Sequence, residues 1–169
     1  MADTGLNATA AALLGLLHDG PMTGGQLMAE AERRLGAYWT MTRSQVYREL
    51  PVLAERGYLR LGKPGPRSSQ PYSVTASGKR AFGKWLAEPA GKDQVRNPVV
   101  LRTAFSSLMP KGEKKDMYEE ALGYHTNALS EVREQAKNAK KEGDEAGATA
   151  LDFAVGYHKA VLAWLKTAK

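Results

Sequence analysis

Apolar residues in the first half of the chain recur at helical spacing in three segments, each preceded by a capping side chain and followed by a glycine. Residues 7–19 start at Asn7 and carry four leucines on one broad apolar face. Residues 23–36 start at Thr23, and residues 42–57 start with the Thr-x-x-Gln pattern of a capping box. The pattern therefore predicts three consecutive helices.

Two short segments after the third helix favour strands. GYLRL at residues 57–61 and PYSVT at residues 71–75 flank a loop rich in glycine, proline, arginine and serine. They predict a β-hairpin with a basic tip, followed by a fourth helix that Thr75 or Ser77 caps and that stops near Pro89. The fold class that we expect is mainly α with a small β-hairpin.

A polar stretch at residues 88–97 predicts a linker between two domains. We place these domains at residues 1–88 and 97–169. The second domain begins with Asn97 and Pro98, which suit the cap and the first position of a short helix. The C-terminal domain is expected to be entirely helical.

The last two helical patterns are long and differ in polarity. A helix of roughly 28 residues is predicted after Pro110, and at about 1.5 Å per residue it spans about 42 Å. After a break at residues 143–147, the final helix, from about Ala148 to Lys166, is apolar over most of its circumference. Because two long helices and one short helix cannot bury such a surface by themselves, we expect it to pack against a second copy in a C2 homodimer.

The composition is that of an ordinary globular protein, with 43% hydrophobic and 25% charged residues in a chain of 169. No run approaches the roughly 18 consecutive apolar residues of a membrane span, and the first residues lack the pattern of a secretory signal. We therefore expect a cytoplasmic protein that does not enter the membrane.

The residue types favour neither a metal site nor catalysis. The chain has no cysteine, and its three histidines are scattered, so that His125 and His158 lack a third protein ligand nearby in the sequence. No nucleophile elbow, phosphate loop, dinucleotide fingerprint or HExxH motif occurs. We expect no metal, no cofactor and no enzymatic activity.

The positive charge is concentrated in one part of the chain. The net charge is +6, and residues 42–84 alone contain nine basic and two acidic residues. A basic block of this kind is typical of a surface that binds a polyanion. Two alternatives are a solvated basic surface without a ligand and a module that binds an acidic protein partner.

The order of three helices, a hairpin and a helix is that of a winged helix-turn-helix domain, in which the third helix enters the DNA major groove. The exposed amino end of that helix has unpaired N–H groups and a positive dipole, which suit phosphate. The candidate DNA contacts on this helix are Thr42, Arg43, Ser44, Gln45, Tyr47 and Arg48. Those in the hairpin loop are Lys63, Arg67, Ser68 and Ser69. The alternatives are a capping role for Gln45 and packing against the wing for Tyr47.

Three stretches carry a resemblance to a known family. LLGLLHDGPMTGGQL, RSQVYRELPVLAERGYL and GPRSSQPYSVTASGK resemble, in order, the first two helices, the recognition helix and the wing of the PadR family of bacterial transcriptional regulators. The C-terminal half is similar to the family's helical dimerisation domain of the virulence-activator type. The resemblance implies a homodimeric regulator, expected to be a repressor, that binds double-stranded DNA at a roughly palindromic operator.

The chain departs from the family pattern at four positions. Thr23 and Gly25 stand where the family often has histidine and tyrosine, and Arg48 stands where it commonly has proline. A proline follows later, at Pro51, where the lost hydrogen bond costs about 3 kcal/mol or kinks the helix.

The family resemblance also implies a response to stress or to a small effector, often an aromatic molecule. The side chains that could line an effector pocket between the linker and the last helix are Phe105, Tyr124, Phe153, Tyr157, His158 and Trp164. Aromatic residues at helical spacing are more often part of a core, which is the alternative for all six.

Overall fold

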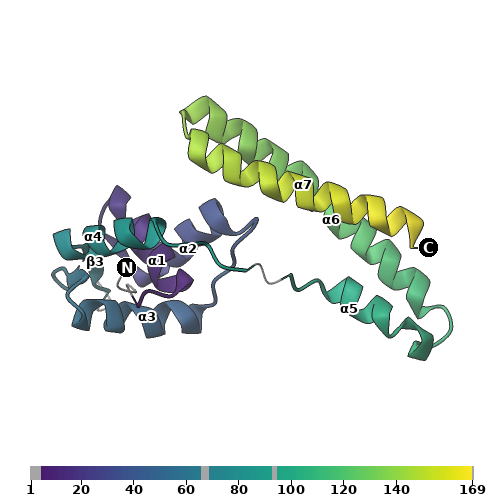
Figure 1. The fold of residues 1–169 in the computed structure, drawn as a ribbon, viewed down its shortest axis with the longest axis horizontal. Helices are drawn as coiled ribbons and strands as arrows, with labels where there is room; N and C mark the ends of the chain where they lie inside the picture. Colours follow the sequence, from purple (N-terminus) through teal and green to yellow (C-terminus); the bar gives the residue numbers. More distant parts are fainter. Residues whose placement is uncertain (1–4, 66–68, 93–94, 169) are drawn as a thin grey trace. The chain divides into compact units, whose positions relative to one another are not determined.

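The computed structural model describes residues 5–65, 69–92 and 95–168. It divides into two compact units, Met1–Ala90 and Gly91–Lys169, which are described separately (Figure 1). In chain order, the elements of the first unit are α1 (Ala8–Leu16), the 3-10 helix η1 (Leu17–Asp19), β1 (Met22–Thr23), α2 (Gly24–Leu35), α3 (Arg43–Glu55), β2 (Leu59–Leu61), β3 (Pro71–Val74) and α4 (Ala76–Leu86). The predicted order of three helices, a hairpin and a helix is confirmed.

Local capping explains where these helices begin. The Asn7 side chain accepts a hydrogen bond from the Ala10 N–H at 2.9 Å, which starts α1. Thr23 and Thr42 both form complete capping boxes, with Gln26 and Gln45 three residues on. Each box satisfies N–H groups that have no partner within the helix.

The sheet has one more strand than the predicted hairpin. β2 and β3 pair antiparallel, with Leu59 opposite Val74, and β1 pairs antiparallel with the other edge of β3, with Met22 opposite Tyr72. The strand order is therefore β1-β3-β2. Because β1 is only two residues long, it has no alternation that would predict it from the sequence.

The core of the first unit lies between α1, α2 and α3. Its fully buried side chains are mostly leucines, and burial of each stabilises the fold by about 1.5–3 kcal/mol. The largest of them are Leu13, Leu14, Leu17, Leu27, Val46, Leu50 and Leu53. Three of these residues come from α3, so the core holds one face of that helix firmly.

α3 continues through Pro51 to Glu55. The proline is exposed and lies in the ninth of the helix's 13 positions. The amino end of the helix, which carries the candidate DNA contacts, therefore belongs to the same continuous helix as the buried residues that follow it.

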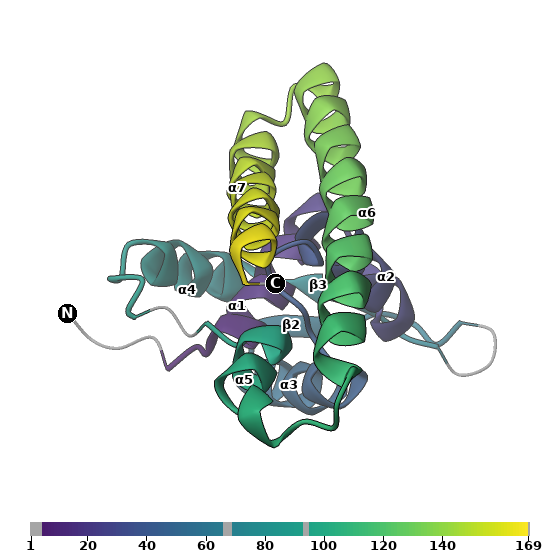
Figure 2. The same cartoon turned by 90° about the vertical axis from the view of Figure 1, so that its right-hand side faces the viewer.

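The second unit is a long helical hairpin, and a short helix precedes it in the chain (Figure 2). Its elements are α5 (Pro98–Ala104), the 3-10 helix η3 (Ser106–Leu108), α6 (Glu113–Glu142) and α7 (Glu145–Thr167). The Asn97 side chain caps α5, as predicted, by accepting from the N–H groups of Val99 and Val100. α6 and α7 lie side by side over most of their length.

The predicted start of the last helix was wrong by three residues. Only Gly143 makes the turn, in a left-handed conformation with φ of 78°, and α7 already begins at Glu145. The Asp144 carboxylate caps the helix by accepting from the Gly147 N–H at 2.8 Å. Gly147 therefore lies inside the first turn of α7. We had expected it to be part of the break between the two helices, and it is not.

Apolar side chains remain exposed on the second unit taken alone. Leu151, Ala154, Val161 and Leu165 are buried in the hairpin. Large apolar residues on other faces are well exposed; they are Leu101, Phe105, Leu108, Tyr124 and Phe153. The predicted surplus was on the last helix, where Phe153 is the member of this set; the other four residues lie on α5, η3 and α6 or directly after α5.

Candidate nucleic-acid interface

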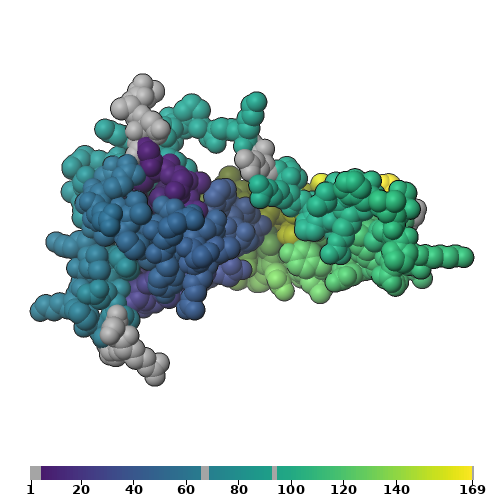
Figure 3. All heavy atoms as spheres, turned by 90° about the horizontal axis from the view of Figure 1, so that it is seen from below, coloured from purple at the N-terminus to yellow at the C-terminus, as the bar shows by residue number. Residues whose placement is uncertain are grey.

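α3 has one buried and one exposed face. Val46 and Leu50 have no exposed surface, whereas Arg43, Ser44 and Arg48 point outward near the amino end of the helix. In the space-filling view, α3 forms a continuous part of the surface of the first unit (Figure 3). The helix therefore presents cationic and hydroxyl side chains while its other face is held in the core.

Gln45 has the capping role that was the alternative to base contact. Its Oε1 atom accepts from the Thr42 N–H at 2.8 Å and from the Thr42 hydroxyl at 3.0 Å. The Thr42 hydroxyl in turn accepts from the Gln45 N–H at 3.3 Å. This box uses the Oε1 atom of Gln45, and the Nε2 donor is not part of it.

Tyr47 packs against the start of α2. A Cβ atom added at Gly24 would lie 3.0–3.1 Å from the Cζ, Cε1 and hydroxyl atoms of Tyr47, so a larger residue would require the ring to shift by a few tenths of an ångström. The Arg43 guanidinium lies 5.7 Å from the centre of the same ring, within the range of a cation–π interaction. Tyr47 thus links α2 to the exposed arginine on α3, and 47% of its surface remains accessible.

Arg48 is loosely paired. Its Nε atom lies 3.6 Å from a carboxylate oxygen of Glu49, and 70% of the Arg48 side chain is exposed. The Glu49 side chain is largely buried, with 10% of its surface exposed, so the pair joins an exposed cation to a buried carboxylate. The exposed guanidinium remains accessible to a ligand beside the helix.

The wing is described only in part. Lys63 is exposed after β2, and Ser69 is exposed before β3. The Gly65 N–H donates to the Ser69 carbonyl at 2.7 Å, which brings the two sides of the loop together. Arg67 and Ser68 lie outside the described residues.

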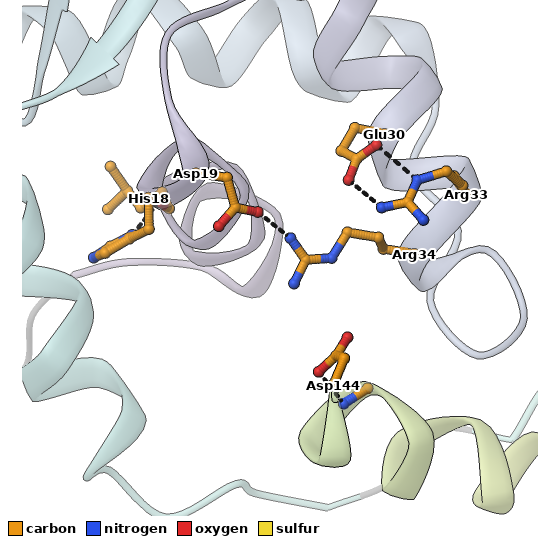
Figure 4. Close-up of polar contacts among 8 residues, drawn as sticks. His18, Asp19, Glu30, Arg33, Arg34 and Asp144 are labelled. Atoms are coloured by element: carbon orange, nitrogen blue, oxygen red, sulfur yellow. Dashed lines mark hydrogen bonds and ion pairs between the residues drawn. The ribbon is translucent and has the colours of Figure 1, made fainter. Parts of the chain in front are cut away.

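Two arginines outside α3 are engaged by carboxylates (Figure 4). Arg33 donates two hydrogen bonds to Glu30, at 2.9 and 2.6 Å, and Arg34 pairs with Asp19. The hydrogen bond from Arg33 holds the pKa of Glu30 below its ordinary value, and the charges of Arg33 and Arg34 act in the same direction. These cations are compensated locally, whereas Arg43 on α3 forms no ion pair with a carboxylate in the part of the chain that the structure describes.

The six candidate effector residues do not form one pocket. Phe105 lines a hollow of about 480 Å³; its other lining residues are Leu101, Arg102, Leu108, Met109 and Pro110. Tyr124, Tyr157 and His158 gather elsewhere, around His125. Trp164 packs edge-on against Tyr118 at 6.2 Å, and Phe153 is 68% exposed.

Two buried histidines, His125 and His158, are in direct contact, which the sequence pattern did not predict. The Nδ1 atoms of His125 and His158 are 2.8 Å apart, between α6 and α7. Burial lowers the pKa of both imidazoles, and for His125 the charge of His158 lowers it further. Within the described residues, no cluster of three histidine, aspartate or glutamate side chains could hold a metal ion.

None of the described helices is long and apolar enough to cross a membrane.

Comparison with known proteins identifies the family. Residues 13–84 match the family model described as the transcriptional regulator PadR-like family. The negative transcriptional regulator PadR of Bacillus subtilis (strain 168) is 26% identical over 147 residues, which cover 84% of this chain and 80% of the relative. A probable transcriptional regulator of Mycobacterium tuberculosis, Rv1176c, is 30% identical over 81 residues, 46% of this chain and 43% of the relative.

Solved structures show the same fold over nearly the whole chain. The structure of Bacillus subtilis PadR in complex with operator DNA superposes with a TM-score of 0.78 at 24% identity and covers 96% of both chains. The PadR-like transcriptional regulator BC1756 from Bacillus cereus superposes with a TM-score of 0.80 at 17% identity and covers 94% of both chains. Residues 13–84 are therefore a domain of the PadR-like family of transcriptional regulators, and the chain has the fold of these solved structures over nearly its whole length.

Proposed function

We propose that this protein is a sequence-specific DNA-binding repressor that acts as a homodimer on a roughly palindromic operator. The observation that carries the proposal is the exposed amino end of α3, where Arg43 and Arg48 extend from a helix whose opposite face is fixed in the core. An arginine in the major groove can donate two hydrogen bonds to the edge of a guanine, which discriminates between bases. The related Bacillus subtilis PadR has been crystallised with operator DNA.

The proposed DNA contacts divide by role. On α3, Arg43, Ser44 and Arg48 are suited to base edges and nearby phosphates, while Thr42 and Gln45 hold the end of the helix in shape. The proposed wing contacts, which would meet the phosphate backbone of the DNA, are Lys63 and Ser69, together with Arg67 and Ser68, which lie outside the described residues. Such wing contacts contribute affinity more than sequence preference.

We assign the C-terminal domain, residues 97–169, to dimerisation and to effector binding. A second copy would cover the exposed apolar residues of the second unit, and two α3 helices would then meet two half-sites about one helical turn apart. Bacillus subtilis PadR has also been crystallised with p-coumaric acid, which supports a small aromatic acid as the effector class. An effector that changes the separation of the two α3 helices would release the operator. A regulator of this kind works in the cytoplasm by binding and needs no catalytic activity.

The proposed function is tested by binding of the full chain to the DNA upstream of its own gene, compared with random DNA of the same length at about 0.15 M salt. We expect a preference of roughly a thousandfold or more for the upstream fragment, and a steep loss of affinity as salt rises. Equal binding to both fragments would contradict the proposal that the protein recognises an operator in this DNA. It would point to an acidic protein as the partner of the basic surface.

Gly24→Ala tests the support that α2 gives to Tyr47. The new methyl group would lie 3.0–3.1 Å from the ring, so the half-exposed ring must shift by a few tenths of an ångström and carry Arg43 with it. We expect operator affinity to fall by roughly three- to tenfold, at most about 1.4 kcal/mol, with little change in thermal stability. Gly25→Ala is the matched control, because an added Cβ at Gly25 meets nothing within 4 Å. The same affinity in both variants would show that the position of Tyr47 is unimportant.

A further inference from the structure

The His125–His158 contact requires a defined protonation state. Both side chains are buried, with 4% and 6% of their surface exposed, and their Nδ1 atoms are 2.8 Å apart. One imidazole must therefore donate its Nδ1–H and the other must accept through an unprotonated Nδ1. If both rings become cations, both Nδ1 atoms carry hydrogen, and the bond is replaced by repulsion between two buried positive charges.

Two aromatic rings lie beside the pair. Those of Tyr124 on α6 and Tyr157 on α7 are 5.0 and 5.3 Å from the adjacent imidazoles. Among the described residues, no carboxylate forms an ion pair with either histidine. The ion pairs on α6 and α7 are Lys115–Glu119, Lys137–Glu134 and Lys140–Asp152. The neighbouring Lys159 is exposed, and Arg102 of α5 lines the separate hollow beside Phe105.

The direction of the pH effect follows from the burial of the pair. Because burial holds the pKa of both histidines below the ordinary value of about 6.5, the unfolded or opened chain binds more protons than the closed hairpin at lower pH. The stabilisation by the neutral pair is therefore complete above about pH 6.5 and is lost progressively as the pH falls below it.

A chain of contacts connects the pair to the end of the linker. The Tyr157 ring lies 5.3 Å from the His158 ring, and the Tyr157 hydroxyl accepts from the Asn97 side-chain amide at 2.9 Å. The Asn97 carbonyl oxygen accepts from the N–H groups of Val99 and Val100, at 3.0 and 3.1 Å, and so caps α5. Movement of Tyr157 would thus remove the hydrogen bond that holds the cap of α5 to α7. The carboxyl end of α5 is held separately, because the Tyr118 hydroxyl of α6 donates to the Thr103 hydroxyl at 3.2 Å.

We propose that the His125–His158 pair is an acid-sensitive latch, which opens when both imidazoles are protonated and which releases the first turn of α5 through Tyr157 and Asn97. The released first turn no longer holds the linker end to the hairpin, so operator affinity falls. This last step rests on the proposed function, whereas the opening of the latch is a property of the second unit alone.

Hydrogen exchange of the Val99 and Val100 amides in the full chain, corrected for the intrinsic pH dependence, tests the latch. Between pH 7.5 and pH 5.5 we expect protection to fall by up to about tenfold for each histidine that titrates. The double variant His125→Asn/His158→Asn keeps a donor and an acceptor but cannot become charged, and its protection is expected to be the same at both pH values. His18→Asn, which removes the exposed third histidine, should behave like the wild type.

A second variant keeps the proposal testable if the double variant does not fold. Tyr157→Phe removes the hydroxyl that holds Asn97 and leaves both histidines, so its α5 amides should be poorly protected already at pH 7.5. Unchanged protection in Tyr157→Phe, or no fall in the wild type at pH 5.5, would overturn the latch. An equal fall in the wild type and the double variant would do the same.

Operator binding at the two pH values, at constant ionic strength, tests the consequence for DNA. We expect the affinity of the wild type to fall at pH 5.5 and that of the double variant to stay constant. A fall of the same size in both proteins would overturn the link between the latch and DNA binding. Absence of selective binding at either pH would refute the proposed function, and hydrogen exchange would still decide whether the latch exists.

Discussion

Replacing Arg43 or Arg48 with alanine is expected to weaken operator binding by roughly 10- to 100-fold, which corresponds to about 1–3 kcal/mol for each lost base contact. Both side chains leave the exposed face of α3 and lie outside the core. Thermal stability should hardly change in Arg43→Ala, whereas Arg48→Ala also removes the ion-pair partner of the buried Glu49 carboxylate and should lower it. The measurement is the affinity of each variant for the upstream fragment and for random DNA at the same salt concentration.

The comparison of the two fragments separates two kinds of contact. An arginine that contacts base edges should lose selectivity, while one that contacts phosphate should lose affinity for both fragments equally. Arg33→Ala is the matched control, because Arg33 lies in the same unit but is hydrogen-bonded to Glu30 on α2. An equal loss in Arg33→Ala would show that only the overall charge of the unit matters, against the specific role of α3.

Replacing Gly78 with alanine is expected to destabilise the first unit by about 1–3 kcal/mol, through overpacking against backbone that cannot move away. A Cβ at this position would overlap the carbonyl oxygen of Tyr58 and would lie 3.0 Å from a methyl carbon of Val74. Thr75 fixes the same junction, because its hydroxyl accepts from the Gly78 N–H at 3.0 Å and donates to the Gly57 carbonyl at 2.7 Å. Denaturant unfolding followed by circular dichroism measures the effect.

Gly83→Ala, in the same helix, is the matched control, and it is not expected to destabilise the first unit. An added Cβ at Gly83 meets nothing within 4 Å, and alanine is favoured over glycine inside a helix by up to about 1 kcal/mol. We therefore expect Gly83→Ala to be neutral or stabilising. If Gly78→Ala were equally harmless, α4 could shift away from β3 freely, and the wing would not be rigidly joined to the helical core.

Much of the fold could be predicted because its signals are local. Asn7, Thr23, Thr42 and Asn97 each cap a helix through atoms two or three residues away, so the capping pattern is visible in the sequence. The start of α7 was missed although its cap, Asp144, is also local. There, one glycine inside a helix costs only about 1 kcal/mol, which packing along the length of α6 offsets.

The sequence predicted the DNA-binding candidates on α3 better than it predicted the effector candidates. The exposed arginines on α3 follow from helical spacing, because Val46, Leu50 and Leu53 define the buried face and leave the other face to solvent. The effector candidates had no such support. Helical periodicity places an aromatic residue on a face but does not decide what that face meets, and the structure distributes the six residues over separate places.

The sequence by itself determined the helices, their caps, the hairpin and the basic amino end of α3, because these depend on side-chain periodicity and on contacts within a few residues. Only the tertiary structure decided that β1 joins the sheet, that Tyr47 packs on Gly24, and that His125 meets His158. These contacts join residues 23, 33 or 50 positions apart, and nothing in the local pattern specifies them. They form because packing of whole elements brings distant side chains together, and the proposed latch depends on one of them.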